Sequence, residues 1–383
     1  MDRRDFLAAS VAALFSSSLY AQPSAQSPGY RRLLVLIELK GGNDGLNTVV
    51  PHADDAYYRL RPRIGVRRDD VLQLDGRTGL HPALKPLLAL WQVRELAIVQ
   101  GVGYPGPNLS HFRSIEIWDT ASKSDEYLAE GWVARAFAGH LVPAQFAADA
   151  IAVGGNDMGP LAGSGTRAIA LSDPAAFLRQ ARLANPVGKA HNSALNHILK
   201  VEADIARAAS QLHGGMQFST EFPRGPFGNA VRVAAQLAAN PAGVAAIRLS
   251  LGGFDTHQNQ PNVHQRLLGE LAEGIAALKS ALLEANRWDS TLVMTYAEFG
   301  RRPQENNSNG TDHGTAAAHF IAGGRVRGGL YGEAPRLGEL EGGNLRHAVD
   351  FRSLYATALE RWWGVSSAGV LKGRFAPLDV LRA

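Results

Sequence analysis

The stretch Leu33-Leu34-Val35-Leu36-Ile37-Glu38-Leu39, followed by Lys40-Gly41-Gly42-Asn43-Asp44, decides the fold class. Glu38 is its one polar residue before Lys40, and the run lies between a pair of arginines and a pair of glycines. A near-continuous apolar run of this length is typical of a strand that is buried on both faces, as in a parallel sheet. The glycines indicate a sharp turn at the end of the strand.

Similar short apolar runs recur along the chain, at Leu96–Val99, Ala150–Val153, Val244–Leu251 and Thr291–Tyr296. Helical patterns lie between and after them. Val263–Ala285 carries a leucine-rich stripe at 3.6-residue spacing. Phe351–Trp363 repeats the pattern, with Asp350 placed to cap it and Gly364 placed to end it. Alternating strands and helices predict an α/β fold with a mostly parallel central sheet and helices on both faces.

The chain has 383 residues, of which 45% are apolar and 19% are charged. This is the composition of a globular protein. The net charge of +4 gives no reason to expect a nucleic-acid partner. The stretch Arg59–Arg68 holds five arginines, which either lie on an ordinary loop or help to hold an anionic substrate. The chain has no cysteine, which excludes disulfides, thiolate metal sites and a cysteine nucleophile.

The N-terminus has the three parts of an export signal: Arg3-Arg4, a run of about 13 mainly apolar residues up to Tyr20, and small residues before Gln22. The arginine pair resembles a twin-arginine signal. A membrane anchor is the alternative, but the run is shorter than the ~20 residues that span a bilayer. We therefore expect a signal peptide at 1–21, a flexible stretch at 22–32, and one domain at 33–383 with a helical insertion near 185–223.

Polar clusters follow three of the expected strands: Asp44 after the first, Asp255-x-His257 after Val244–Leu251, and Asp312-His313 in the loop after Thr291–Tyr296. Open α/β sheets bind ligands at the carboxyl ends of their strands, so these side chains are expected to converge. Carboxylate and imidazole ligands suit zinc first, with manganese, calcium or magnesium as other candidates. The alternatives are surface Asp-His pairs and, for Asp44, a side chain that only closes a turn.

Ser110 is the candidate nucleophile, because it precedes a helix that we expect to run from His111 to Thr120. A helix N-terminus favours an anion and an activated oxygen. The alternative for Ser110 is a helix cap. His111 either orients the nucleophile or lies on the helix surface. A serine esterase is a weaker reading because no G-x-S-x-G motif surrounds Ser110.

The chain resembles the DUF1501 family of exported bacterial proteins, within the alkaline phosphatase–sulfatase superfamily. The residues that carry this resemblance are Lys40-Gly-Gly-Asn-Asp-Gly-Leu-Asn-Thr48, Ser110-His-Phe-Arg-Ser114, Gly131-Trp-Val-Ala-Arg135, Gly253-Phe-Asp-Thr-His257, Glu298-Phe-Gly-Arg301 and Gly310-Thr-Asp-His-Gly314. By resemblance the fold is alkaline-phosphatase-like, one or two divalent ions are bound by Asp44, Asp255, His257, Asp312 and His313, and Ser110 is the nucleophile.

The sequence departs from the superfamily pattern in two respects. Asp255 and His257 are closer together than the usual Asp-x-x-x-His, and the expected late histidine is either His319, which is equally well a core residue, or His347. Glu298 is either an added ligand or a partner of Arg301. His81 is expected to cap a helix, and His264 is expected to face solvent on the leucine-rich helix.

These observations leave two readings. The first is an exported, periplasmic hydrolase of phosphate or sulfate esters that depends on a divalent metal ion. The second is a non-catalytic exported protein of the same fold that binds metal or a cell-envelope polymer. The expected partners are a small anionic ester or an envelope polymer, and the twin-arginine export machinery. We expect no membrane span in the mature chain.

Replacing Arg3 and Arg4 by lysine should slow export, because the arginine pair is the part of the signal that the export machinery recognises. Fractionation of cells followed by N-terminal sequencing measures this. The exported wild-type protein should begin near Gln22. An intact Met1 in the membrane fraction would contradict the prediction.

Overall fold

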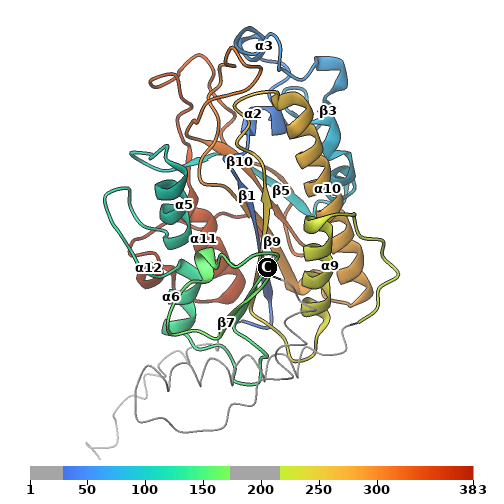
Figure 1. Cartoon of the computed structure of the whole chain (residues 1–383), viewed down its shortest axis with the longest axis vertical. Helices are drawn as coiled ribbons and strands as arrows, with labels where there is room; N and C mark the ends of the chain where they lie inside the picture. Colours follow the sequence, from blue (N-terminus) through green and yellow to red (C-terminus); the bar gives the residue numbers. More distant parts are fainter. Residues whose placement is uncertain (1–28, 173–215, 383) are drawn as a thin grey trace, which may run out of the picture.

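The computed structural model describes residues 29–172 and 216–382. The expected signal peptide, most of the stretch at 22–32 and most of the helical insertion near 185–223 lie outside these residues. The described part builds one large sheet with helices packed on it, and a small three-stranded sheet at one end (Figure 1).

The central sheet has the strand order β11-β5-β10-β9-β1-β8-β6-β7, with β12 also paired to β5. All of its pairs are parallel except those of β10, which runs antiparallel to β5 and to β9. The mostly parallel sheet predicted from the sequence is therefore confirmed. Its strands are β1 (Leu33–Lys40), β5 (Leu96–Gly103), β6 (Ala150–Val153), β7 (Ala168–Leu171), β8 (Ala246–Gly252), β9 (Thr291–Tyr296), β10 (Ala317–Ala322), β11 (Gly329–Gly332) and β12 (Val349–Asp350).

Strand β1 lies at the centre of the sheet, between β8 and β9, and it is buried from Leu33 to Leu39. Alternate side chains of a strand point to opposite faces. Leu33, Val35, Ile37 and Leu39 accordingly belong to one hydrophobic core, whereas Leu34 and Leu36 belong to a second. The continuous apolar run thus contributes side chains to both hydrophobic cores.

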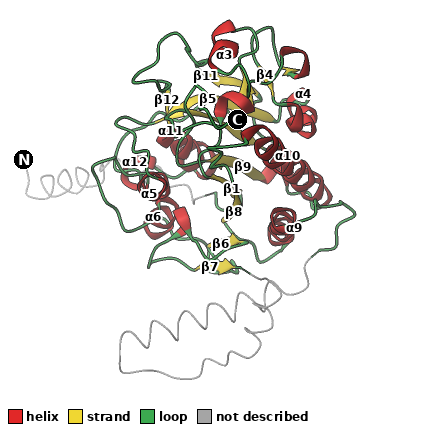
Figure 2. Ribbon diagram, turned by 45° about the horizontal axis from the view of Figure 1, so that its top comes forward, coloured by secondary structure: helices red, strands yellow, loops and turns green. Residues whose placement is uncertain are grey.

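Helices cover both faces of the sheet, as predicted (Figure 2). The first core contains α9 (Pro226–Ala239), α10 (Gln260–Glu284), η2 (Pro82–Leu87) and α4 (Leu88–Gln92). The second core contains α5 (His111–Thr120), α6 (Trp132–Gly139), α11 (Phe351–Ala356), η5 (Thr357–Trp363) and α12 (Ser367–Val370). The remaining elements are α2 (Gly45–Thr48), β2 (Val49–Val50), α3 (Asp55–Leu60), η1 (Arg68–Asp70), β3 (Leu72–Gln73), β4 (Gly79–Leu80), η3 (Gly159–Leu161) and η4 (Trp288–Ser290).

Several predicted elements have the expected bounds. Strands β6 and β9 match, and helix α5 begins at His111 and ends at Thr120. Asp350 caps α11 by accepting the N–H of Arg352, and Gly364 ends the following π-helical turn with a φ of 72°. The chain at Phe351–Trp363 is helical, but its second half is π-helix rather than the α-helix that the spacing suggests.

The stretch predicted to be flexible at 22–32 is ordered at its end. Tyr30 is buried, and its ring packs edge-on against Phe137 and Trp363 at centroid distances of 5.3 and 5.4 Å. Gly29 donates its N–H to the carbonyl of Trp363 at 2.7 Å. Aromatic packing therefore holds the chain before β1 in place. No helix within the described ranges is both long and apolar enough to cross a membrane.

Candidate metal centre

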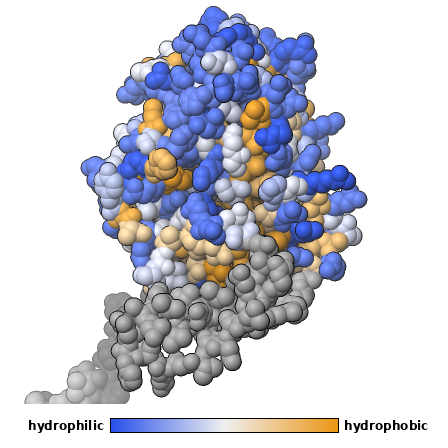
Figure 3. All heavy atoms as spheres, in the orientation of Figure 1, coloured by the Kyte–Doolittle hydropathy of each residue, from blue (hydrophilic) through white to orange (hydrophobic). Residues whose placement is uncertain are grey.

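Four segments of the described chain meet at the carboxyl edge of the parallel strands. The loops after β1, β8 and β9 are neighbours because these strands are adjacent, and α5 follows β5 at the same edge. Strand β10 is antiparallel, so the residues that precede it, including Asp312 and His313, reach this edge from the opposite direction. The upper end of the molecule in this view is largely hydrophilic (Figure 3).

The side chain of Arg301 connects these loops by hydrogen bonds. Its side chain is fully buried, and it donates to the carbonyl oxygens of Gly41 and Gly42 after β1, Phe254 after β8 and Thr311 before β10. Its Nη2 also lies 2.6 Å from Oδ1 of Asp255. A planar guanidinium with five N–H donors is suited to this arrangement. The loops after β1 and β8 touch so closely that a Cβ on Gly41 would lie 2.4 Å from the backbone nitrogen of Asp255.

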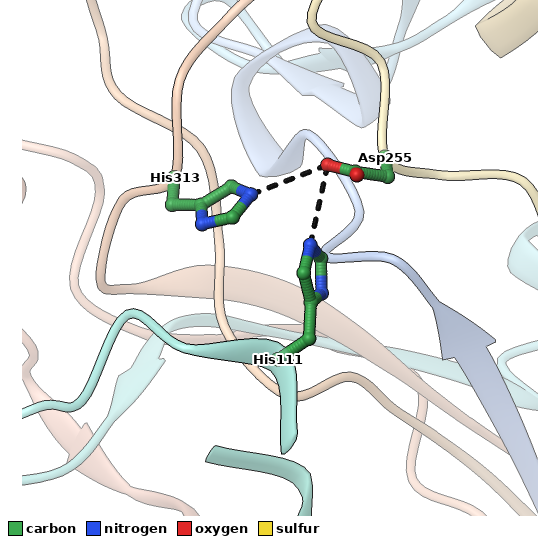
Figure 4. Close-up of side chains that lie close together, drawn as sticks. All are labelled: His111, Asp255 and His313. Atoms are coloured by element: carbon green, nitrogen blue, oxygen red, sulfur yellow. Dashed lines mark hydrogen bonds and ion pairs between the residues drawn. The ribbon is translucent and has the colours of Figure 1, made fainter. Parts of the chain in front are cut away.

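Asp255 is the centre of the cluster. Its Oδ1 lies 3.4 Å from Nε2 of His111, 3.1 Å from Nε2 of His257 and 3.2 Å from Nε2 of His313. Figure 4 shows His111, at the start of α5, and His313, on a loop, directing these nitrogens at the carboxylate. Three imidazole nitrogens therefore converge on one carboxylate oxygen.

The second ring nitrogen of each histidine faces an oxygen acceptor. Nδ1 of His313 lies 2.8 Å from the carbonyl oxygen of Leu109, which can only accept, so this Nδ1 carries the proton. Nδ1 of His111 lies 2.8 Å from Oε1 of Glu298, and Nδ1 of His257 lies 3.4 Å from Oδ1 of Asp312. Neutral histidines in this arrangement present the Nε2 lone pair to the centre of the cluster. Histidines that bind metals are generally oriented in this way.

These residues fit a divalent metal ion. Ligand atoms of His111, Asp255 and His313 all lie within 4.8 Å of one another. Nε2 of His257 and Nε2 of His313 are only 2.9 Å apart. Two unprotonated nitrogens at this distance repel each other unless a cation or a proton lies between them. Three imidazoles and a carboxylate are a ligand set that zinc prefers, and the other divalent ions of the sequence analysis use carboxylate oxygen as well.

Charge and exposure also favour this role. Burial alone would raise the pKa of Asp255, but the hydrogen bond and charge of Arg301 outweigh it and hold this pKa at about 2. The carboxylate is therefore ionised at neutral pH. Burial lowers the pKa of His313, which favours its neutral form. The side chains of Asp255 and His257 are 48% and 43% exposed, so the cluster is open to solvent.

The structure brings four of the five predicted ligands together: Asp255, His257 and His313 in the cluster, and Asp312 behind His257. Asp44 is not among them. Its carboxylate accepts the N–H groups of Leu46 and Asn47 at the start of α2 and pairs with Arg61 at 2.6 Å, with both side chains fully buried. Gln260 donates to the same carboxylate. Burial raises the pKa of Asp44, but Arg61 outweighs it and lowers the pKa overall. Asp44 therefore closes the turn, which is the alternative that the sequence left open.

Ser110 stands beside the cluster. It occupies the N-cap position of α5, but its side chain makes no capping hydrogen bond. It is exposed, and it lies between Leu109, which binds His313, and His111, which reaches Asp255. Ser110 is thus flanked on both sides by residues that contact the cluster, and its hydroxyl makes no capping hydrogen bond.

Three further histidines lie outside the cluster, and His347, the other candidate for the late ligand, is exposed on the loop between β11 and β12. His319 is buried in β10, where burial lowers its pKa to about 3. His81 caps η2 by accepting the N–H of Ala83, as predicted. The expectation that His264 faces solvent is wrong, because it is 1% exposed and its Nε2 lies 2.9 Å from Oδ1 of Asn43. Asn43 also bonds to Thr48, so it holds the turn after β1.

Two residues whose roles were open in the sequence belong to the site. His111 reaches Asp255, and Glu298 holds His111 while also accepting the N–H of Gly41 at 2.9 Å. Asn306, which the sequence reasoning missed, donates to the carbonyl of His257 and to Asp312. Its place in the polar Asn306–Gly310 loop was the available indication. The arginines of the basic stretch Arg59–Arg68 do not belong to the cluster. Four of them form ion pairs, with Asp44, Glu305, Asp70 and Asp55.

Comparisons with known proteins give a family and distant structural similarity. A family described as "Protein of unknown function (DUF1501)" matches residues 76–372. No curated protein matches the sequence significantly. Similar solved structures include a phosphonate monoester hydrolase from Silicibacter pomeroyi (11% identity, TM-score 0.43, covering 89% of this chain and 75% of that one). Others are the periplasmic domain of EcEptC from Escherichia coli in complex with zinc (12%, 0.37, 79% and 75%) and the alkaline phosphatase of the Antarctic bacterium TAB5 (12%, 0.34, 80% and 95%). At such TM-scores the chemistry of the site has to be argued from its own residues.

Replacing Arg61 by leucine should lower the free energy of unfolding by about 3–5 kcal/mol, because it leaves the charge of Asp44 buried and unpaired. The double variant Arg61→Leu with Asp44→Asn should recover much of this loss. Denaturant unfolding measures both, with the exposed Arg59→Leu as the matched control. If Asp44→Asn alone removed a bound metal ion, the structural role of Asp44 would be wrong.

Proposed function

The chain belongs to the DUF1501 family, and we propose that it is a metal-dependent hydrolase of phosphate or sulfate esters. One observation carries this proposal: three imidazole nitrogens, oriented by bonds on their far sides, converge on the Asp255 carboxylate at an open edge of the sheet. His111, Asp255, His257 and His313 would hold the ion. A divalent ion at this place supplies a Lewis acid for the ester oxygens.

The chain's own groups provide the other parts of a hydrolytic site. Helix α5 has ten residues and begins at His111, whose side chain is part of the cluster. The positive end of a helix favours the negative charge of a phosphate or sulfate group. We propose that Oγ of Ser110 attacks the phosphorus or sulfur atom and that the alcohol leaves. Water then cleaves the resulting serine ester.

Glu298 and Arg301 have supporting roles in this proposal. Glu298 fixes the ring of His111 through Nδ1, so that Nε2 faces the ester site. Arg301 keeps the Asp255 carboxylate in place and ionised. Neither side chain is exposed, so we assign both to positioning rather than to contact with the substrate.

A second candidate function is a non-catalytic exported protein that binds metal or a cell-envelope polymer. It is favoured by the pairing of Asp44 with Arg61, because this pairing removes one ligand of a second metal ion. Within the described ranges, the ligands gather in one group rather than two. Under both functions we propose export to the periplasm, on the basis of the Arg3-Arg4 signal.

Removing a ligand histidine should remove the ion. We expect His257→Ala and His313→Ala each to lower the metal content of the purified mature protein, because each removes one of the converging Nε2 atoms. Elemental analysis measures the content, and His347→Ala is the matched control on a loop outside the cluster. A chelator should lower the melting temperature of the wild type, since ligand binding stabilises the native state. A wild-type protein that contains no metal and does not respond to the chelator would rule the site out.

Replacing Ser110 by alanine should lower hydrolysis of an aryl phosphate or aryl sulfate by on the order of a thousandfold, with metal content unchanged. Its stability should change by less than about 0.5 kcal/mol, because Ser110 makes no capping bond. Ser110→Thr, which keeps a hydroxyl, should retain part of the activity. Full activity of the alanine variant would exclude the serine ester. A wild type that holds metal but cleaves no such ester would favour the binding function.

A further inference from the structure

A cavity of about 400 Å³ lies under the loop that joins β11 to β12. Its walls come from α2, the end of β5, the start of β10 and residues 333–348. Elements α2, β5 and β10 lie together in the upper half of Figure 1. The volume is within the range of sites that bind small molecules. None of the cluster residues His111, Asp255, His257 and His313 lines it.

Gln100 gives this cavity a polar group in need of a partner. It lies in β5 among the fully buried apolar residues Ile98, Val99 and Val102, and it is only 6% exposed. It lines the cavity, and its amide has no hydrogen-bond partner in the described part of the chain. The amide atoms are accessible from the cavity, so they are available to donate and accept hydrogen bonds there. A ligand in the cavity could therefore bond to Gln100.

The charges around the cavity are already balanced. Arg336 pairs with Glu333 at 2.9 Å and with Glu339 at 3.4 Å, and Arg346 lies 3.5 Å from Glu341. The lining thus offers no unpaired lysine or arginine that would attract a phosphate or sulfate group. Leu46, Val49 and Leu345 contribute apolar surface. The lining therefore suits an uncharged ligand that has both hydrogen-bonding groups and apolar faces.

A second hollow adjoins the cavity, and Leu345, Arg346 and His347 line both. It contains Asn344, whose Oδ1 is buried and also lacks a partner. Thr315 lines this hollow two residues after His313, so it extends toward the metal centre. The Nδ2 of Asn344 donates to the carbonyl oxygen of Gly342, so only its Oδ1 remains for a ligand in this hollow.

We propose that the cavity at Gln100 binds a neutral sugar unit, with a neighbouring unit at Asn344. A carboxamide both donates to and accepts from sugar hydroxyl or acetamido groups, and the apolar walls contact the C–H faces of the ring. This inference goes beyond the hydrolase proposal. It does not require the metal ion, and it assigns a carbohydrate site on the same side of the sheet.

Isothermal titration calorimetry of the mature protein with cellobiose and with the β1,4-linked disaccharide of N-acetylglucosamine tests the proposal. The protein is first treated with a chelator, so that failure of the metal site does not affect the result. We expect one of these disaccharides to bind, and Gln100→Leu to weaken binding by about tenfold or more. Ala334→Trp, which fills the cavity from the loop, should do the same. Gln73→Leu, an exposed glutamine on β3, is the matched control.

Gln100→Leu is expected to keep the melting temperature, because it removes no hydrogen bond to the described part of the chain. Weaker binding by this variant is then not a consequence of unfolding. The proposal is overturned if neither disaccharide binds or if Gln100→Leu binds as the wild type does. It is also overturned if inorganic phosphate competes with the sugar, or if His257→Ala rather than Gln100→Leu abolishes binding. Either result would place the sugar at the metal centre.

Discussion

The candidate site depends on the buried guanidinium of Arg301. It bonds four backbone carbonyls from the loops after β1 and β8 and before β10, and it also holds the carboxylate of Asp255. Buried carbonyl groups in loops need donors, and one arginine side chain supplies them at three places. A lysine at this position would lack the planar fork and leave several of these oxygens without a partner. Without Arg301 these loops would lose the hydrogen-bond donor that they share.

The outward bonds of the histidines complete this support. Each of the three rings in the cluster is held by a different part of the chain: the carbonyl of Leu109, the carboxylate of Glu298 and the carboxylate of Asp312. These bonds set the direction of the rings. The side chains of the candidate site are thus oriented by the protein itself, which would reduce the free-energy cost of ordering them on binding.

Much of this arrangement follows from the sequence. The apolar runs identified the main strands. Ligands of open α/β sheets bind at the carboxyl ends of the strands, and this rule predicted that Asp255, His257, Asp312 and His313 lie together. The same rule failed for Asp44, because its partner Arg61 is on a loop 17 residues away, and nothing in the local pattern shows that this loop folds back. His264 was misplaced for a similar reason, since its partner Asn43 is 221 residues distant. Spacing along the chain predicts which face of an element a residue is on. It does not predict which polar group from a remote segment will meet it.

The long separations within the cluster also affect when the cluster can form. Glu298 and His111 are 187 residues apart, His313 and Leu109 are 204 apart, and Arg301 and Gly41 are 260 apart. Contacts between such distant segments form late in folding, after the strands that carry them have paired. A partly synthesised or unfolded chain therefore has no assembled ligand set. If the protein leaves the cytoplasm already folded, as the proposed export route requires, the cluster is complete before translocation. Because the cluster is open to solvent, a metal ion could then bind on either side of the membrane.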